Sequence, residues 1–146
     1  MQIKATCLAS LLLALSLPMH ASASFTGSWA HRGEANSGIW LKTRQQGKQV
    51  RFEMEILRGA PSYNTGWIEG TVDLKNGKGV FRSREFGECA IAFEFKDRSV
   101  RLTHPDMLVE CGFGHNVFAE GTLLRKSRVP PEFCREDPRS GDCPGN

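Results

Sequence analysis

Residues 49–57, with the sequence QVRFEMEIL, decide the fold because apolar and charged residues alternate from Val50 to Ile56. The apolar set is Val50, Phe52, Met54 and Ile56, and the charged set is Arg51, Glu53 and Glu55. Alternation with a period of two is typical of a β-strand that turns one face to a core and the other to water. We therefore predict a strand over residues 49–57 and an all-β fold around it.

The same alternation recurs along the chain, and turn-forming sequences separate the segments that show it. Asn76-Gly77 supplies the positive φ angles that a tight hairpin turn requires, and polar turns are also expected at 45–48 and 96–99. Reading between the turns predicts strands at 25–32, 38–44, 49–57, 66–74, 79–85, 89–95, 99–104 and 116–126, with 107–111 as a candidate for one more.

Consecutive hairpins without a sustained helical period predict an antiparallel meander of about eight strands. Such a meander must bury one face of its sheet and protect its edges, which a small barrel or a two-layer β-sandwich achieves. We predict a closed or nearly closed barrel, with the two-layer β-sandwich as the alternative. Glycines near the strands fit the bulges and coiling that such curvature requires, namely Gly70, Gly79, Gly87 and Gly121.

Residues 1–23 are typical of a cleaved secretory signal peptide. Lys4 supplies the positive charge, residues 8–17 an apolar core, and Ala21-Ser22-Ala23 the small residues before a cleavage site. The apolar run is too short to span a membrane, which takes about 20 residues. We expect the mature chain to begin near Ser24, to be periplasmic or secreted, and to have no membrane span.

The rest of the chain divides into one domain and a tail. Residues 24–126 hold all the predicted strands and are long enough for one modest core. Residues 127–146 are rich in proline and charge, so we expect an irregular tail outside the barrel. The formal net charge is only +3 with the signs interspersed, which gives no electrostatic case for a nucleic-acid partner.

Four cysteines remain once Cys7 is removed with residues 1–23, and these are Cys89, Cys111, Cys134 and Cys143. An exported protein is expected to oxidise them to disulfides, and four cysteines allow three pairings. Closeness in the sequence and the predicted strand order favour Cys89 with Cys111 and Cys134 with Cys143. The second pair would close a small loop in the tail.

Possible metal ligands gather between residues 104 and 115, and they are His104, Asp106, Glu110 and His115. They lack the spacing of common metal motifs, and the predicted strands do not show that they converge. We therefore expect no metal or cofactor.

Motifs for catalysis are also missing. The chain has no Gly-x-Ser-x-Gly elbow, and a disulfide would remove Cys111 as a nucleophile. The acids that could act on a glycoside fall at outward strand positions, where carboxylates are ordinarily solvated: Glu53, Glu55, Glu69 and Glu94. We expect a protein that is not an enzyme.

Two loops are candidate binding surfaces. Residues 58–66 form a longer connection than the neighbouring hairpins and contain Tyr63, with Trp67 just beyond. A long loop on a rigid scaffold is a frequent place for recognition, although a plain surface connection fits this stretch equally well. Residues 111–116 place Phe113 between two glycines and next to His115. Phe113 either faces a partner or folds into the barrel mouth, and we favour the barrel mouth.

The large aromatic residues of the first two strands, Phe25, Trp29 and Trp40, are expected in the core, since large rings most often fill it. Trp67 falls on the face opposite Ile68 and is expected to be exposed. An exposed tryptophan suggests contact with a carbohydrate or a protein.

The segment Ser37-Gly38-Ile39-Trp40, together with the signal peptide and the small barrel, resembles small exported β proteins of Gram-negative bacteria that inhibit lysozymes. Those proteins insert a loop with a Ser-Gly-x-x-Tyr motif into the cleft of the glycosidase, and here a tryptophan takes the place of the tyrosine. The resemblance implies an inhibitor or immunity protein that occludes a cell-wall hydrolase. The expected partner-binding residues are Ser37, Gly38, Tyr63, Trp67, Phe113 and His115.

Two other functions stay open at this point. A small-molecule or lipid carrier would use the barrel interior and predicts a true cavity there, whereas the many Phe and Trp residues at inward positions favour a filled barrel. A hydrolase with unrecognised residues predicts acids clustered in a cleft.

Overall fold

The computed structural model describes residues 24–34, 36–106 and 110–134. The predicted signal peptide lies outside the described residues, as do Cys143 and most of residues 127–146. Eight strands form, and their bounds are β1 (Gly27–Arg32), β2 (Gly38–Gln46), β3 (Gln49–Leu57), β4 (Thr65–Asp73), β5 (Lys78–Ser83), β6 (Cys89–Phe95), β7 (Ser99–Thr103) and β8 (Gly121–Ser127).

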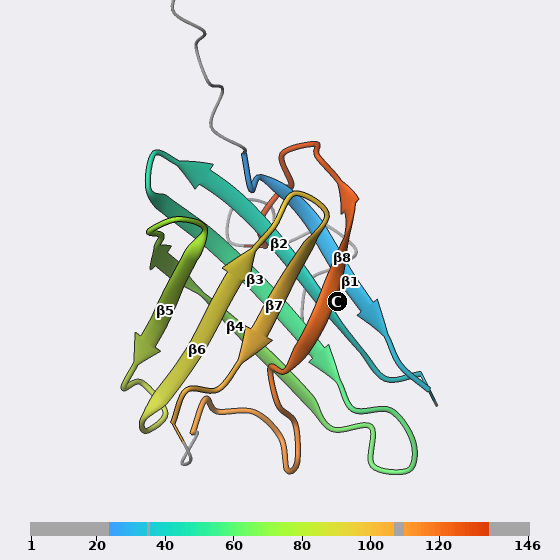
Figure 1. The fold of residues 1–146 in the computed structure, drawn as a ribbon. Helices are drawn as coiled ribbons and strands as arrows, with labels where there is room; N and C mark the ends of the chain where they lie inside the picture. The colour runs from blue at the N-terminus through green and yellow to red at the C-terminus, as the bar shows by residue number, and fades with distance from the viewer. Residues whose placement is uncertain (1–23, 35, 107–109, 135–146) are drawn as a thin grey trace, which may run out of the picture.

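All eight strands belong to one antiparallel sheet with the order β4-β3-β2-β1-β8-β7-β6-β5. Hairpins join neighbours in the sequence, and β8 returns to pair with β1, so the sheet curls into a nearly closed barrel (Figure 1). The prediction of an antiparallel barrel is confirmed, and the strands do not divide into the two layers of a sandwich. The tight Asn76-Gly77 turn is also confirmed, since both residues have positive φ.

The barrel closes at the β4–β5 seam through side chains, because these two strands are the ends of the hydrogen-bonded order. Phe81 of β5 lies over Gly70 of β4, where an added Cβ would stand only 2.3 Å from its ring. The same ring meets Phe52 edge to face, with the ring centroids 5.0 Å apart. Glycine at position 70 thus lets an aromatic ring bridge the two edges.

Aromatic side chains fill the interior, as the alternation predicts. Phe52 and Phe93 are buried with their centroids 4.9 Å apart, and Trp29 packs edge to face on Phe95 at 5.6 Å. The Trp29 indole N–H donates to Thr43 Oγ1 over 2.8 Å, which satisfies the one polar group of that ring inside the core. The interior of the barrel is therefore mainly apolar, and its buried Thr43 hydroxyl is hydrogen-bonded.

The last strand begins later than predicted, at Gly121 instead of residue 116. Val117 and Ala119 are both buried, which produced the strand-like alternation. Their N–H groups, however, donate to Gly114 O and His104 Nε2 rather than to a neighbouring strand. Of the extra strand considered at 107–111, Met107–Val109 lie outside the described residues, and Glu110 and Cys111 are not in a strand.

The described part of the tail, residues 128–134, packs against the outer face of β2 and β3. Phe133 is fully buried there, with the guanidinium groups of Arg44 and Arg51 at 4.9 and 4.3 Å from its ring centroid. Arg44 also donates to the Pro131 carbonyl oxygen at 2.6 Å. This described part of the tail lies outside the barrel as predicted, but it is docked on the barrel surface, which the sequence did not indicate.

The predicted disulfide between Cys89 and Cys111 is present and joins β6 to the long β7–β8 connection. It is compatible with an exported protein in an oxidising compartment. The predicted pairing of Cys134 with Cys143 involves a residue outside the described part of the chain. In the described ranges, no helix is long and apolar enough to cross a membrane.

Candidate binding surfaces

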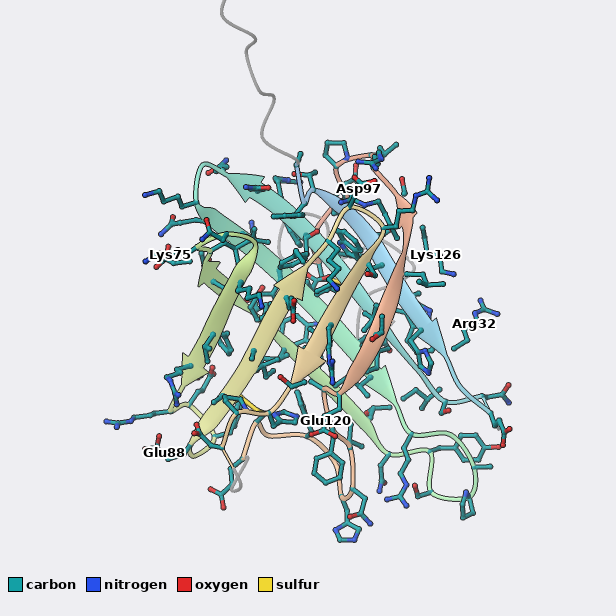
Figure 2. All side chains as sticks on the ribbon, viewed as in Figure 1. Arg32, Lys75, Glu88, Asp97, Glu120 and Lys126 are labelled. Atoms are coloured by element: carbon teal, nitrogen blue, oxygen red, sulfur yellow. A yellow bond between two sulfur atoms is a disulfide. The ribbon has the colours of Figure 1, made fainter. Side chains whose placement is uncertain are left out.

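The two ends of the barrel differ in their connections. The loops after β1, β3, β5 and β7 emerge at one end, at the bottom of Figure 1, and they are the longer ones: 33–37, 58–64, 84–88 and 104–120. We call this the long-loop end. The opposite, short-turn end has only the connections 47–48, 74–77 and 96–98. Figure 2 marks the long-loop end by Glu88 and Glu120 and the short-turn end by Lys75 and Asp97.

Two loops of the long-loop end are fixed to each other by hydrogen bonds. The Asn64 side-chain amide donates to the His115 carbonyl oxygen at 2.8 Å, and the Gly114 N–H donates to Thr65 O at 2.9 Å. Arg58 closes the 58–64 loop by donating its N–H to Asn64 O at 2.9 Å. The loops around Tyr63 and His115, both predicted as binding residues, are thus brought together and held in place.

Phe113 folds into the barrel mouth, which is the alternative that the sequence analysis favoured. Its half-buried ring packs against the core, and an added Cβ at Gly66 would stand 2.6 Å from Phe113 Cδ1. Phe113 therefore anchors its loop to β4. The His115 side chain, two residues on, is exposed.

Three large aromatic side chains are exposed at the long-loop end. Tyr63 is 55%, Phe86 62% and Phe118 52% exposed, each on a different loop. Phe86 leans on Gly112, where an added Cβ would stand 2.7 Å from its ring, beside the Cys89–Cys111 disulfide. Sequence reasoning selected Tyr63 and missed Phe86 and Phe118. For Phe86, the available signal was its position between two predicted strands, next to Gly87. Phe118 fell inside the strand predicted at 116–126, where its alternation with the buried Val117 and Ala119 was the available signal.

Two of the four residues considered for metal binding, His104 and Asp106, make structural contacts. His104 is held through both ring nitrogens, with Nδ1 2.9 Å from Ala90 O and Nε2 accepting the Ala119 N–H at 3.1 Å. Asp106 pairs with Arg82 at 2.8 Å. The described ranges contain no group of three or more side chains that could hold a metal ion.

A groove of about 670 Å³ crosses the outer face of the wall formed by β4, β3, β2, β1 and β8. We call it the Trp groove, and its lining residues include Ser28, Ala30, Arg32, Trp40, Lys42, Glu53, Glu55, Leu57, Trp67 and Lys126. Figure 2 shows Arg32 and Lys126 on this side of the barrel. The strand register sets Trp40, Glu55 and Trp67 in one cross-strand row, since Trp40 pairs with Glu55 and Glu55 with Trp67.

The prediction that Trp40 belongs to the core is wrong. Its neighbours Ile39 and Leu41 are buried inside, so the alternation of β2 sends Trp40 to the outer face, where it is half-buried. Trp40 Cη2 lies over Gly38, 2.7 Å from where a Cβ would stand. The ring therefore lies along the strand over the backbone of Gly38. Trp67 is 37% exposed on the same face, as predicted.

Glu53, expected to be solvated, is only 4% exposed because the tail covers it. Its carboxylate accepts the Cys134 N–H at 2.7 Å and lies 3.5 Å from Lys42 Nζ. Glu55, two residues along the same strand face, is exposed. The two carboxylates at the Trp groove thus have different environments.

Ser37 and Gly38 lie where the β1–β2 hairpin enters β2. The Ser37 hydroxyl donates to Glu34 O at 2.7 Å, which holds the turn, and Gly38 supplies the space for Trp40. A strict Ser-Gly-x-x-Tyr motif would place its aromatic residue at position 41, where Leu41 is buried in the core. The expectation that Trp40 takes the place of the tyrosine is therefore wrong, because Trp40 comes one position earlier and on the outer face.

The six predicted binding residues thus fall on two surfaces. Ser37, Tyr63, Phe113 and His115 lie in connections of the long-loop end, whereas Trp67 lines the Trp groove and Gly38 lies under the Trp40 ring. Searches of protein-family models, of curated proteins and of solved structures each found no significant match to this chain.

Proposed function

We propose that this protein is an exported, non-enzymatic binding protein whose long-loop end docks on a protein partner. The observation that supports it is the exposure of Tyr63, Phe86 and Phe118 on loops that are fixed at their bases. Aromatic side chains are enriched at the centres of protein interfaces and dominate their energetics. Loops that are already ordered lose little conformational entropy on binding, which raises affinity.

The partner class that we propose is a cell-wall hydrolase, inhibited by occlusion of its cleft. The resemblance in architecture to exported lysozyme inhibitors, namely a predicted signal peptide and a small antiparallel barrel, supports this choice. The β1–β2 hairpin with Ser37 also lies at the same end as Tyr63 and His115. Projecting loops are complementary to the concave cleft of a glycosidase. Tyr63 would enter the cleft, and the exposed His115 ring would donate or accept a hydrogen bond at its rim.

The contacts inside the molecule favour this proposal over the two alternatives. A carrier needs an interior cavity, but buried rings of Trp29, Phe52 and Phe93 occupy the inside of the barrel. A glycoside hydrolase needs two carboxyl groups that are free to exchange protons and attack. Of the two acids that line the Trp groove, Glu53 is instead held by Lys42 and the Cys134 N–H, and only Glu55 is exposed.

The test is a titration of purified lysozymes and of a lytic transglycosylase with residues 24–146, measured as the rate of clearing of a cell-wall suspension. We expect at least one hydrolase to lose activity in proportion to the protein added. Tyr63→Ala should weaken inhibition about tenfold or more, since aromatic anchors often contribute over 1.4 kcal/mol. Lys75→Ala, at the short-turn end, is the matched control and should inhibit like the wild type.

The proposal fails if none of these hydrolases is inhibited. It also fails if a Tyr63→Ala/Phe118→Ala variant, with an unchanged circular dichroism spectrum, inhibits as well as the wild type.

A further inference from the structure

We infer that the Trp groove is a second binding site, which takes a β-linked oligosaccharide by stacking its sugar rings on Trp40 and Trp67. The site lies on the outer face of β1–β4 and β8, away from the exposed aromatics of the long-loop end. The inference does not depend on the function proposed above.

The strand register fixes the separation of the two tryptophans along the backbone. Trp40 pairs with Glu55 on β3, and Glu55 pairs with Trp67 on β4, so the tryptophans are two strand spacings apart. Two spacings of a β-sheet are about 10 Å. The two rings can therefore contact different sugar units of one chain that runs across the strands, with Glu55 between them.

The backbone under Trp40 is shaped to receive its ring. Because Gly38 has no side chain, the six-membered ring of Trp40 lies along β2 instead of standing upright. On either side of Gly38 in the register are Arg32 and Leu57, which also line the groove. The Trp40 ring therefore lies close to the sheet surface, with the charged Arg32 on one side and the apolar Leu57 on the other.

The polar groups of the groove match the hydroxyls of a sugar better than a strongly charged ligand. Arg32 and Lys126 are donors and Glu55 is an acceptor, and none of the three forms an ion pair within the described part of the chain. An anionic ligand would be repelled by Glu55, and a cationic ligand would be repelled by Arg32 and Lys126. A neutral ring with an apolar C–H face and a rim of hydroxyls can use the indoles, the donors and the acceptor together.

A contrast with the inner face shows that these tryptophans are not core residues. Trp29 is completely enclosed and its N–H is bonded to Thr43. Neither Trp40 nor Trp67 has a hydrogen-bond partner for its indole N–H among the interactions of the described residues. Both N–H groups remain as donors for a ligand, in addition to the ring faces.

The test uses three hexasaccharides, namely β-1,4-linked N-acetylglucosamine, β-1,4-linked glucose and α-1,4-linked glucose, with binding measured by calorimetry and by tryptophan fluorescence. We expect saturable binding of at least one β-linked chain and weaker binding of the α-linked chain. Trp40→Ala and Trp67→Ala should each weaken it about tenfold or more, which is ~1.4 kcal/mol. Val80→Ala, which shortens an exposed apolar side chain on β5 outside both proposed sites, should bind like the wild type.

Trp67→Phe keeps a ring at the same place and should recover most of the lost affinity, which separates stacking from a fold defect. The inference is overturned if no β-linked hexasaccharide saturates the wild type at millimolar concentration. It is also overturned if folded Trp40→Ala and Trp67→Ala variants bind the oligosaccharide as well as the wild type does. Choline serves as a quaternary ammonium probe, because aromatic side chains also bind such cations. Saturation by choline alone would likewise overturn the inference. Inhibition of a hydrolase through Tyr63 can succeed or fail in either case, so the two proposals are distinguishable.

Discussion

The long-loop end and the short-turn end of the barrel are both closed by a phenylalanine, but they are stabilised in different ways. At the long-loop end, Phe113 packs over Gly66, and the loops are joined by a disulfide and side-chain hydrogen bonds. At the short-turn end, Phe25 stacks on Phe95 with the centroids 4.9 Å apart. Residues 24–26 and Arg128 lie near this stack. The strand connections at this end are short turns and not long loops.

Arg125 is the main link at the short-turn end. Its guanidinium lies 4.0 Å from the Trp29 ring centroid and donates to Thr26 O and Ser24 O at 3.1 Å. Burial, as the largest cause, lowers the pKa of Arg125 from its usual value. The contacts at one end of the barrel thus fix projecting loops, whereas those at the other hold residues 24–26 and Arg128. This difference supports placing protein recognition at the long-loop end.

The largest expected effect comes from removing the covalent link of the long-loop end. A Cys89→Ser/Cys111→Ser variant should lose about 3 kcal/mol of unfolding free energy, the usual value for a loop of this order. Urea denaturation followed by circular dichroism measures the loss. Wild type and variant with equal midpoints would mean that the loops are fixed without the disulfide.

A smaller effect is expected where the tail docks near the short-turn end. Glu53→Ala removes the acceptor of the Cys134 N–H and the partner of Lys42, so it should cost about 1–2 kcal/mol and expose the tail. Trypsin cleavage after Arg128 should become faster. Glu55→Ala, on the same face of β3 and without a hydrogen bond or ion pair to the described part of the tail, is the control. Equal cleavage rates in both variants would show that Glu53 does not hold the tail.

The comparison of the two ends also shows what the sequence could predict. The bounds of β3 were predicted without error because local alternation and a glycine turn both define them. The start of β8 was predicted wrongly, because Val117 and Ala119 are buried in a loop that packs on His104. That contact joins residues far apart in the sequence and leaves no local pattern. Likewise, the sequence shows the two tryptophans but not that β2, β3 and β4 align them.

Trp40 illustrates a different kind of error. Its position in β2 follows from alternation with Ile39 and Leu41, but ring size alone suggested the core. Strand parity was the stronger signal, because a shift of one residue would turn the whole strand inside out. Because Gly38, Trp40 and Lys42 share one face of β2, strand parity would have placed Trp40 on the outer surface.

A third prediction concerns the hydrogen bond between the two loops of the long-loop end. Asn64→Ala removes the donor to His115 O, and the expected loss of stability is about 1 kcal/mol. Hydrogen exchange should become faster at the Gly114 amide, which bonds to Thr65 O in the same contact. Ser62→Ala, in the same loop, is the control. Unchanged exchange at Gly114 would contradict the idea that Asn64 orders these loops.

The smallest effect is expected at the opposite end, from the exposed pair of Asp97 and Arg128, whose side chains lie 2.7 Å apart. The hydrogen bond from Arg128 and its charge hold the pKa of Asp97 below its usual value of 3.8. A lowered pKa in the folded state stabilises the fold above pH 3.8, and this contribution disappears as the pH falls through the lowered value. Asp97→Asn should therefore lower the melting temperature slightly at neutral pH and leave it unchanged in strong acid. Because the pair is exposed, added salt should shrink the difference at neutral pH. A difference that persists in strong acid and in high salt would instead assign Asp97 a packing role in the β6–β7 turn.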